Sequence, residues 1–355
     1  ISPYLVEGGQ TVLPSRTSPP RGMPQMKKGS QPTDGGNLIL TNKERAELLE
    51  KEPGAERWLR PFIGGEELLN GGHRWCLWLK NISLPELQAL PQVQVRVEKV
   101  RASRLKSPTA SVRRFADYPT LFTQDRQPDS DYLAVPEVSS EARRFIPIAF
   151  LPATVIASNK LQIIVGGTLF HFGVLSSTMH MAWVRVVSGR LESRYSYAPA
   201  VYNNFPWPQL DAPDYIQTVP YADGLCVREA ASRLYWSSYH DGSEIEGVPL
   251  ETKHVSAYLK GDAKKIATVE AASLKVLAAR ARNPTSTLAD MYDPLLMPPE
   301  LVKAHAELDR AVDRCYRAAP FKSDRQRVEF LFALYEQCAA PLLPARKTKQ
   351  KRKTR

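Results

Sequence analysis

The sequence predicts an α+β fold, in which a mixed, mostly antiparallel sheet domain is followed by a helical bundle. Short apolar runs separated by turn-forming residues predict the strands of a twisted sheet at 132–136, 144–150 and 161–165. Later in the chain, apolar residues recur at helical spacing and predict helices at 264–280, 299–316 and 324–339. A chain of 355 residues with 43% hydrophobic residues is long enough to bury a sizeable core in two or three domains.

Capping patterns mark two helices at the start of the sheet domain. Thr41 is followed three residues later by Glu44, and Ser83 by Glu86, which is the pattern of a capping box. The segment between these two patterns is apolar and aromatic enough for a buried strand. The predicted elements are therefore helices at 41–49 and 84–90 and a strand at 73–79.

The segment 92–105 admits two interpretations. Val93, Val97 and Val100 recur at helical spacing, whereas Val93, Val95 and Val97 also alternate as in a strand. Charged residues fill many of the other positions, so we favour a helix.

Composition and apolar pattern define the remaining elements. Apolar residues cover nearly every side of 170–187, which predicts one buried helix that ends before Gly189. A further strand is expected at 195–202. Residues 1–40 are rich in Gly, Pro and Ser, and we expect a connecting arm that arrives from an upstream domain.

The net charge of +11 is concentrated in two basic clusters. The last ten residues carry seven basic residues and no acid, and 96–114 carries seven basic residues and one acid. Because the rest of the chain is nearly neutral, these clusters predict contact with a polyanion. A solvated helix face and a disordered tail are the alternative interpretation.

Composition also excludes several classes of protein. No apolar stretch is long enough to cross a bilayer, and the N-terminus has neither an initiator methionine nor the features of a signal peptide. The four cysteines lie far apart without a CxxC pair, so the sequence supports neither a zinc site nor a disulfide framework. We therefore expect a cytoplasmic protein, and we expect this chain to be a fragment of a longer one.

The most informative segment is 201–208, which is dense in aromatic residues and proline. Composition alone favours a packed aromatic corner between two domains. The segment also resembles the end of the target-recognition region of single-chain restriction-modification DNA methyltransferases of the MmeI-like (type IIL) family. Other segments resemble this family in the same order along the chain, at 1–5, 32–38, 62–67, 73–79, 138–141, 172–181 and 288–293.

The resemblance implies the C-terminal part of a DNA adenine-N6 methyltransferase and restriction enzyme. It implies double-stranded DNA and an upstream methyltransferase domain of the same polypeptide as partners, and S-adenosylmethionine as cofactor of the full-length protein. Residues 225–263 fit the family poorly and are interpreted as a local insertion. The implied parts are a connecting arm at 1–40, a DNA target-recognition domain at 41–210, a C-terminal helical domain at 211–344 and a basic disordered tail at 345–355.

The chemistry of methyl transfer is missing from the sequence. Such an enzyme needs Asp, Asn or Ser followed by two prolines and an aromatic residue, which together hold the flipped base. The closest segment, 18–20, is followed by Arg21 where the aromatic residue belongs. The glycine pairs at 64–65 and 166–167 are typical of turns and not of a cofactor-binding loop. We therefore expect no catalytic residue, no metal and no cofactor in this fragment.

The resemblance implies that the segment from Glu192 onward contacts DNA bases. If this segment is extended, Glu192, Arg194 and Ser196 share one side of it. Arginine matches the paired acceptors of guanine and glutamate accepts from the cytosine amino group, so the two suit one C·G pair. A local surface ion pair is the alternative. The central basic cluster is assigned to phosphate contacts through Arg101, Arg104, Lys106, Arg113 and Arg114.

Other polar residues are better explained by structure than by chemistry. His180 lies in an apolar run and is expected to be a hydrogen-bonded core residue. Asp290 and Asp293 suit capping or turn roles, and His73 with Cys76 is at most half of a metal site. Two other functions stay open at this point. One is an interaction scaffold whose basic tail targets it to nucleic acid, and the other is an enzyme with a site around His180 and Asp290.

Overall fold

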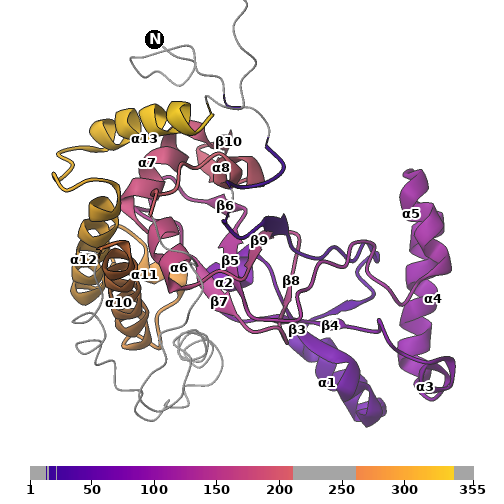
Figure 1. Cartoon of the computed structure of the whole chain (residues 1–355). Coiled ribbons are helices and arrows are strands. Elements are labelled where there is room, and N and C mark those ends of the chain that lie inside the picture. The colour runs from indigo at the N-terminus through magenta and orange to yellow at the C-terminus, as the bar shows by residue number, and fades with distance from the viewer. Residues whose placement is uncertain (1–12, 14–15, 21, 211–260, 340–355) are drawn as a thin grey trace, which may run out of the picture.

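The structure of the protein is a computed structural model that describes residue 13 and residues 16–20, 22–210 and 261–339. Its architecture is α+β, as predicted. Three small sheets form the middle of the molecule, with the helices of 261–339 on one side and α4 (Pro91–Leu105) at the opposite end (Figure 1). The predicted tail at 345–355 and all but the last three residues of the predicted insertion at 225–263 lie outside the described residues.

The first sheet is antiparallel, with strand order β1-β9-β5-β7. Its strands are β1 (Met26–Lys28), β5 (Tyr132–Pro136), β7 (Ala149–Leu151) and β9 (Leu161–Val165). The strands predicted at 132–136 and 161–165 are confirmed, whereas only the end of 144–150 belongs to β7. Every residue of β5 and β7 is buried, which explains why these strands are continuously apolar and not alternating.

The second sheet has the order β2-β4-β3-β8 and is antiparallel except for the parallel pair of β3 and β8. Its strands are β2 (Ile39–Leu40), β3 (Leu59–Ile63), β4 (Arg74–Leu77) and β8 (Ile156–Ala157). Strand β4 confirms the strand predicted at 73–79. A separate hydrophobic core joins this sheet to α4 and includes Leu40, Phe62, Val93 and Val97.

Two segments of the expected connecting arm, 26–28 and 39–40, are strands of the sheets, so the arm does not extend over the whole of 1–40. Strand β1 pairs with β9, and β2 pairs with β4. Between them, Gly29 passes so close to Ser158 that a Cβ atom at Gly29 would lie 2.2 Å from the Ser158 carbonyl oxygen. Composition did not predict these strands, because most backbone N–H and C=O groups of a Gly- and Pro-rich segment can still form the hydrogen bonds of a sheet.

Two helices of residues 42–117 begin where the capping patterns predict. The Thr41 hydroxyl accepts from the Glu44 N–H at 3.2 Å, and the Glu44 carboxylate accepts from the Thr41 N–H at 2.9 Å. Ser83 and Glu86 form the same reciprocal pair. The helical interpretation of 92–105 is confirmed by α4. The other helices here are α1 (Asn42–Lys51), α2 (Gly65–Asn70), α3 (Leu84–Gln88) and α5 (Ala110–Arg114), with 3-10 turns η1 (Pro53–Trp58) and η2 (Phe115–Asp117).

The single helix predicted at 170–187 is wrong, because the structure has two helices there, α6 (Leu169–Leu175) and α7 (Thr178–Val187). Ser177 separates them. Its hydroxyl donates to the backbone carbonyl at the end of α6 at 2.7 Å and accepts from an N–H of α7 at 3.4 Å. A serine in this position caps a new helix, so the apolar run is interrupted without losing its burial.

The third sheet contains a hairpin and has the order β10-β11-β6. Its strands are β6 (Val138–Ser139), β10 (Gly189–Leu191) and β11 (Arg194–Ser196). The strand predicted at 195–202 therefore ends at Ser196. Helix α8 (Pro199–Asn203) follows, and its proline stands in the first turn, where a missing N–H costs nothing.

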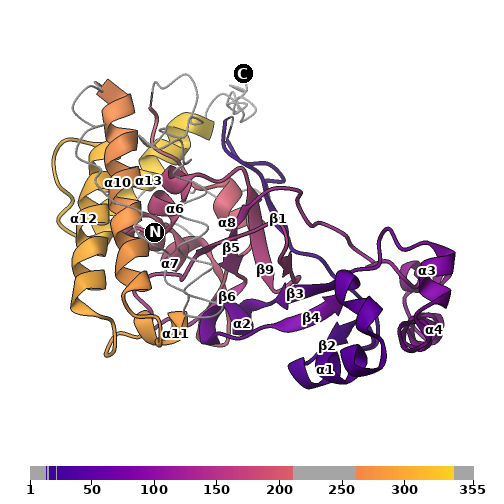
Figure 2. The same ribbon diagram turned by 90° about the horizontal axis from the view of Figure 1, so that it is seen from below.

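The helices predicted at 264–280, 299–316 and 324–339 are confirmed. Helix α10 (Gly261–Ala281) packs against α6 at Gly173, where a Cβ atom would lie 2.4 Å from the Ser273 hydroxyl. One continuous core joins these helices to the first sheet, and Figure 2 shows α10 and α12 (Pro299–Tyr316) on the opposite side from α4. The helices are α10 (Gly261–Ala281), α11 (Leu288–Met291), α12 (Pro299–Tyr316) and α13 (Asp324–Ala339).

Candidate nucleic-acid interface

Helix α4, which carries much of the central basic cluster, is fixed at both ends by buried charged residues. At its N-terminus the Glu52 carboxylate accepts hydrogen bonds from the backbone N–H groups of Gln92 at 2.5 Å and Val93 at 3.3 Å. A carboxylate there satisfies N–H groups that have no partner within the helix and lies at the positive end of the helix dipole. Arg104 holds the other end.

The assignment of Arg104 to a phosphate contact is wrong. Its side chain is buried, with 1% of the residue exposed. A guanidinium has five N–H donors, and the structure gives all five a backbone carbonyl acceptor at 2.6 to 3.0 Å. Arg104 therefore holds together the loops around the end of α4, through the carbonyls of Pro32, Thr33, Phe115, Tyr118 and Leu121.

The spacing of the sequence contained a signal for this role. Val93, Val97, Val100 and Arg104 follow one another at four, three and four residues, which places all four on one helix face. The structure buries all four. An arginine on the apolar face of a helix is a candidate for a buried structural role. Arg104 was counted with the basic cluster without regard to the helix face on which it lies.

The other four predicted phosphate-binding residues are exposed on α4, α5 and the turn between them. Arg113 uses one nitrogen to donate to the carbonyls of Ser107 and Pro108, both at 2.8 Å. Among the described residues, no carboxylate forms an ion pair with Arg101, Lys106 or Arg114. These three cations are therefore available to a polyanion.

The segment Gly189–Ser196, named here the recognition hairpin, forms two paired strands, so the stretch from Glu192 to Ser196 is not extended throughout. Leu191 pairs with Arg194, so Glu192 and Ser193 form a two-residue turn. Glu192 has φ of 56°, which belongs to a turn and not to a strand. Arg194 and Ser196 still share one face of β11, since side chains alternate along a strand.

Two charged residues of the hairpin pair with each other at its tip, whereas Arg190 lies 3.6 Å from Glu141 outside the hairpin. Arg194 Nη2 donates to Glu192 Oε2 at 2.6 Å, and the two side chains are 46% and 77% exposed. Arg190 lies over the Tyr195 ring at 4.0 Å from its centre and donates to the Ser193 carbonyl at 3.0 Å. The tip is thus ordered by local contacts while its hydrogen-bonding groups face solvent.

Three further charged residues lie beside the hairpin and were missed by the sequence analysis. Strand β6 pairs with β11, and Glu137 directly precedes β6. The Glu137 carboxylate lies 2.6 Å from Lys28 Nζ and 3.9 Å from Lys160 Nζ. These residues come from three distant parts of the chain, so only the pairing of the strands brings them together.

Two family models match this chain. The model described as MmeI, target recognition domain, matches residues 7–209, and the model described as MmeI, C-terminal domain, matches residues 261–343. The chain belongs to the MmeI family. Both helix α4 and the recognition hairpin lie within the target recognition domain.

Individual relatives agree with this membership. The solved structure of the type IIL restriction-modification enzyme MmeI in complex with DNA has a TM-score of 0.78 and 37% identity, over 96% of this chain and 39% of its own. DNA methyltransferase A of Bacillus subtilis (strain 168) is 32% identical over 338 residues, which are 95% of this chain and 32% of the relative. The chain thus spans between 32% and 39% of the length of these relatives.

The aromatic segment 201–208 lies at the end of the MmeI target recognition match and is entirely buried. The Tyr335 hydroxyl of α13 donates to the Asn204 side chain at 3.3 Å, and the Tyr316 hydroxyl of α12 donates to the Pro206 carbonyl at 3.1 Å. The interpretation as a packed aromatic corner is confirmed. The segment joins the two MmeI domains.

His180 is a buried core residue, as expected. Its Nδ1 lies 2.9 Å from the Leu175 carbonyl, and its Nε2 lies 3.0 Å from the Tyr197 hydroxyl. Burial lowers the pKa of His180 to about 3, so the ring is neutral near pH 7. Because both ring nitrogens have partners within the core, His180 braces the chain that leaves β11.

The other polar candidates also have structural roles. Asp290 forms a capping box with Thr287, and Asp293 accepts from the Leu295 N–H at 2.8 Å. Burial raises the pKa of the Cys76 thiol. The described residues contain no group of three or more His, Cys, Asp or Glu that could hold a metal ion. None of the described helices is long and apolar enough to cross a membrane.

Proposed function

We propose that this chain is the double-stranded DNA recognition module of a DNA adenine-N6 methyltransferase and restriction enzyme. The observation that carries the proposal is the match of the MmeI target recognition domain over 7–209, the region that presents both an exposed basic helix and an exposed charged hairpin. Its solved relative is a restriction-modification enzyme in complex with DNA. No comparable observation favours the alternative, an interaction scaffold that binds nucleic acid without sequence preference.

The two charged regions have different tasks in this proposal. Arg101, Lys106, Arg113 and Arg114 contact phosphates, which fix the register of the protein on the duplex without selecting a sequence. Helix α4, which carries Arg101, is held at its start by Glu52, so this cation projects from a fixed platform.

The recognition hairpin contacts the bases. Arg194 supplies a guanidinium that matches guanine O6 and N7, Glu192 accepts from the cytosine amino group, and Ser196 lies on the same strand face as Arg194. An exposed ion pair contributes about 0.2–1 kcal/mol, so Glu192 and Arg194 can exchange their mutual contact for base contacts at little cost.

Catalysis belongs to an upstream methyltransferase domain of the same polypeptide, in a cytoplasmic enzyme that uses S-adenosylmethionine. The described residues of this chain do not fit that cofactor. Among them, two glycine pairs lie between a strand and the helix that follows it, Gly64-Gly65 before α2 and Gly166-Gly167 before α6. The Gly64 N–H is already bonded to the Glu67 carboxylate at 2.7 Å, and the Thr168 N–H at the start of α6 is bonded to His171 Nδ1 at 3.1 Å. Two glutamates in the first turn of α2 fill this helix start with negative charge.

The test is binding of this chain to duplex DNA at two salt concentrations. The slope of log affinity against log salt is about −0.9 per phosphate contact, so four contacts predict a loss of at least roughly 100-fold between about 50 and 200 mM salt, and the seven basic residues of the last ten can add to it. Anisotropy of a labelled duplex measures it. Affinity that is independent of salt, or absent at both concentrations, contradicts the proposal.

A further inference from the structure

The recognition hairpin continues directly from helix α7. The helix ends at Val187 and β10 begins at Gly189, so the tilt of α7 sets the direction in which the hairpin leaves the domain. Helix α7 packs on α13 through Trp183, whose ring centre lies 5.3 Å from that of Phe332. Apolar burial is not directional, so this contact alone does not define the angle between the helices.

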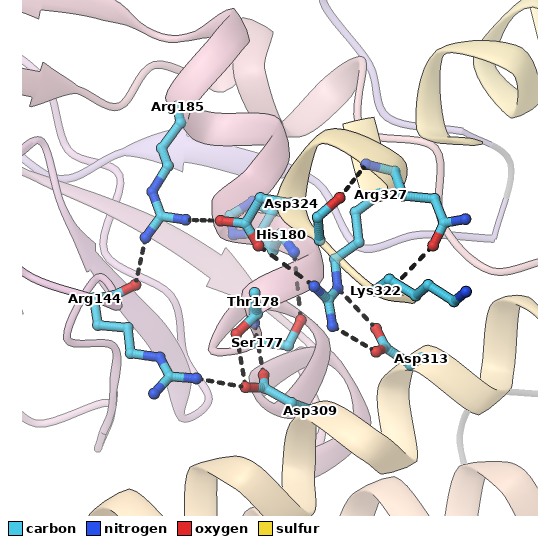
Figure 3. A network of polar contacts seen from close by, with 12 residues as sticks. Arg144, Ser177, Thr178, His180, Arg185, Asp309, Asp313, Lys322, Asp324 and Arg327 are labelled. Atoms are coloured by element: carbon cyan, nitrogen blue, oxygen red, sulfur yellow. Dashed lines mark hydrogen bonds and ion pairs between the residues drawn. The ribbon is translucent and has the colours of Figure 1, made fainter. Parts of the chain in front are cut away.

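A series of ion pairs at the end of α7 nearest the hairpin defines the angle between the two helices (Figure 3). Arg185 Nη1 donates to Asp324 Oδ2 at 2.5 Å, which joins the last turn of α7 to the first residue of α13. The other oxygen of Asp324 lies 3.4 Å from Arg327. Arg327 in turn donates to both oxygens of Asp313 on α12, at 2.7 and 3.2 Å.

The other end of α7 is attached to the same helix, α12. Asp309, one turn before Asp313, accepts from the Thr178 N–H at 2.7 Å and from the Thr178 hydroxyl at 2.6 Å. Arg144 lies 3.5 Å from the same carboxylate. Both ends of α7 are therefore fixed to the C-terminal domain by charged groups with defined geometry.

We propose that Arg185 and Asp324 are positioning residues for DNA recognition, through which the C-terminal domain sets the angle at which the hairpin meets the base edges. The proposal rests on the proposed function of the hairpin. Base contacts require side chains to be held within about 0.5 Å of their working positions, so a small rotation of α7 is enough to weaken them. The two side chains are 32% and 45% exposed, so removing their ion pair leaves the apolar contact of α7 with α13 in place.

The experiment uses the full-length enzyme with Asp324→Asn or Arg185→Gln, which break the same ion pair from opposite sides. Adenine methylation of a plasmid library is followed by sequencing, and the base position that the hairpin contacts is identified by exchanging the charges of Glu192 and Arg194. Both variants should methylate sites with a wrong base at that position about tenfold more, relative to the correct site. Preference at the other positions should stay unchanged, and Arg185→Lys, which keeps the cation, should retain most of the discrimination.

Glu329→Gln is the matched control. It breaks the exposed pair of Arg325 and Glu329, which lies within α13 and joins no other helix, and it should leave every preference unchanged. Unchanged discrimination in both Asp324→Asn and Arg185→Gln overturns the proposal. So does an equal loss at every position together with a lower melting temperature, because that pattern indicates a structural role only. If the charge exchange alters no position, the base-contact function of the hairpin fails, and the positioning role fails with it.

Discussion

Helix α4 and the recognition hairpin both present charged side chains to solvent, but they are held in different ways. The ends of α4 are fixed by buried charges, Glu52 at the start and Arg104 at the end, each bonded to backbone groups. The charges at the hairpin tip, Glu192 and Arg194, are exposed and bonded to each other. A rigid platform suits phosphates, which repeat along every duplex, whereas a tip with exchangeable contacts suits bases, which differ between sites.

The comparison also shows that position decides the role of an arginine more than the charge of its neighbours does. Arg101 and Arg104 lie three residues apart on α4 and belong to the same basic cluster. Arg101 is exposed, and Arg104 is 1% exposed. The first is free to bind an anion, and the second is part of the fold.

The largest effect is expected for Arg104→Met, which removes the buried guanidinium and its five hydrogen bonds to partly buried carbonyls. Losing several hydrogen bonds of one charged group is costly even where the acceptors are partly buried, so the free energy of unfolding should fall by about 3–5 kcal/mol. Urea denaturation of this chain measures it. Arg101→Met is the matched control, and it should change stability by no more than about 0.5 kcal/mol. Similar losses in both variants would remove the distinction between the two arginines.

Lowering the pH should destabilise the region of α7 and β11, where His180 is buried, before it destabilises α4. The pKa of His180 is about 3 in the folded protein and 6.5 in the unfolded chain, so its contribution to stability is complete above pH 6.5. That contribution is lost as the pH falls from 6.5 toward 3, by about 1.4 kcal/mol per pH unit. Hydrogen exchange at pH 7 and pH 5 should show α7 and β11 losing protection before α4.

His180→Gln, which cannot gain a proton in this range, should flatten that dependence on pH. Part of the slope should remain, because burial also lowers the pKa of His305 on α12. Identical slopes in the variant and in the original protein would show that His180 does not control acid stability.

The smallest effect is expected for Arg101→Ala. Losing one phosphate contact should weaken binding to all duplexes alike and lower the salt slope by about one unit. Anisotropy titrations on two unrelated duplexes measure both quantities. An effect confined to one base position would indicate that Arg101 contacts a base and not a phosphate.

Local signals predicted the helices well. The capping boxes at Thr41 and Ser83 placed two helix starts correctly, because the bonds that cap a helix join residues three apart. The boundary between α6 and α7 was not predicted, since Ser177 caps a helix inside a run that is apolar on both sides. Strand β1 escaped because its pairing partner lies more than 130 residues away in the chain.

The candidate site was predicted in outline only. The turn at Glu192 was missed because a positive φ is usually marked by Gly or Asn, and this turn has neither. No sequence pattern predicted the cluster of Lys28, Glu137 and Lys160, since their proximity depends on pairing between distant strands. Exposure and burial, which separate Arg101 from Arg104, are decided by tertiary packing.

We infer that the hairpin tip selects a base while α4 does not. Exchanging the charges of the tip, with Glu192→Arg and Arg194→Glu in the full-length enzyme, tests it most directly when every methylated site is sequenced. We predict that the preferred base changes at one position, with about 1–3 kcal/mol of discrimination, and that all other positions keep their preference. An enzyme that keeps its original site with unchanged preference at every position would show that the pair only stabilises the hairpin.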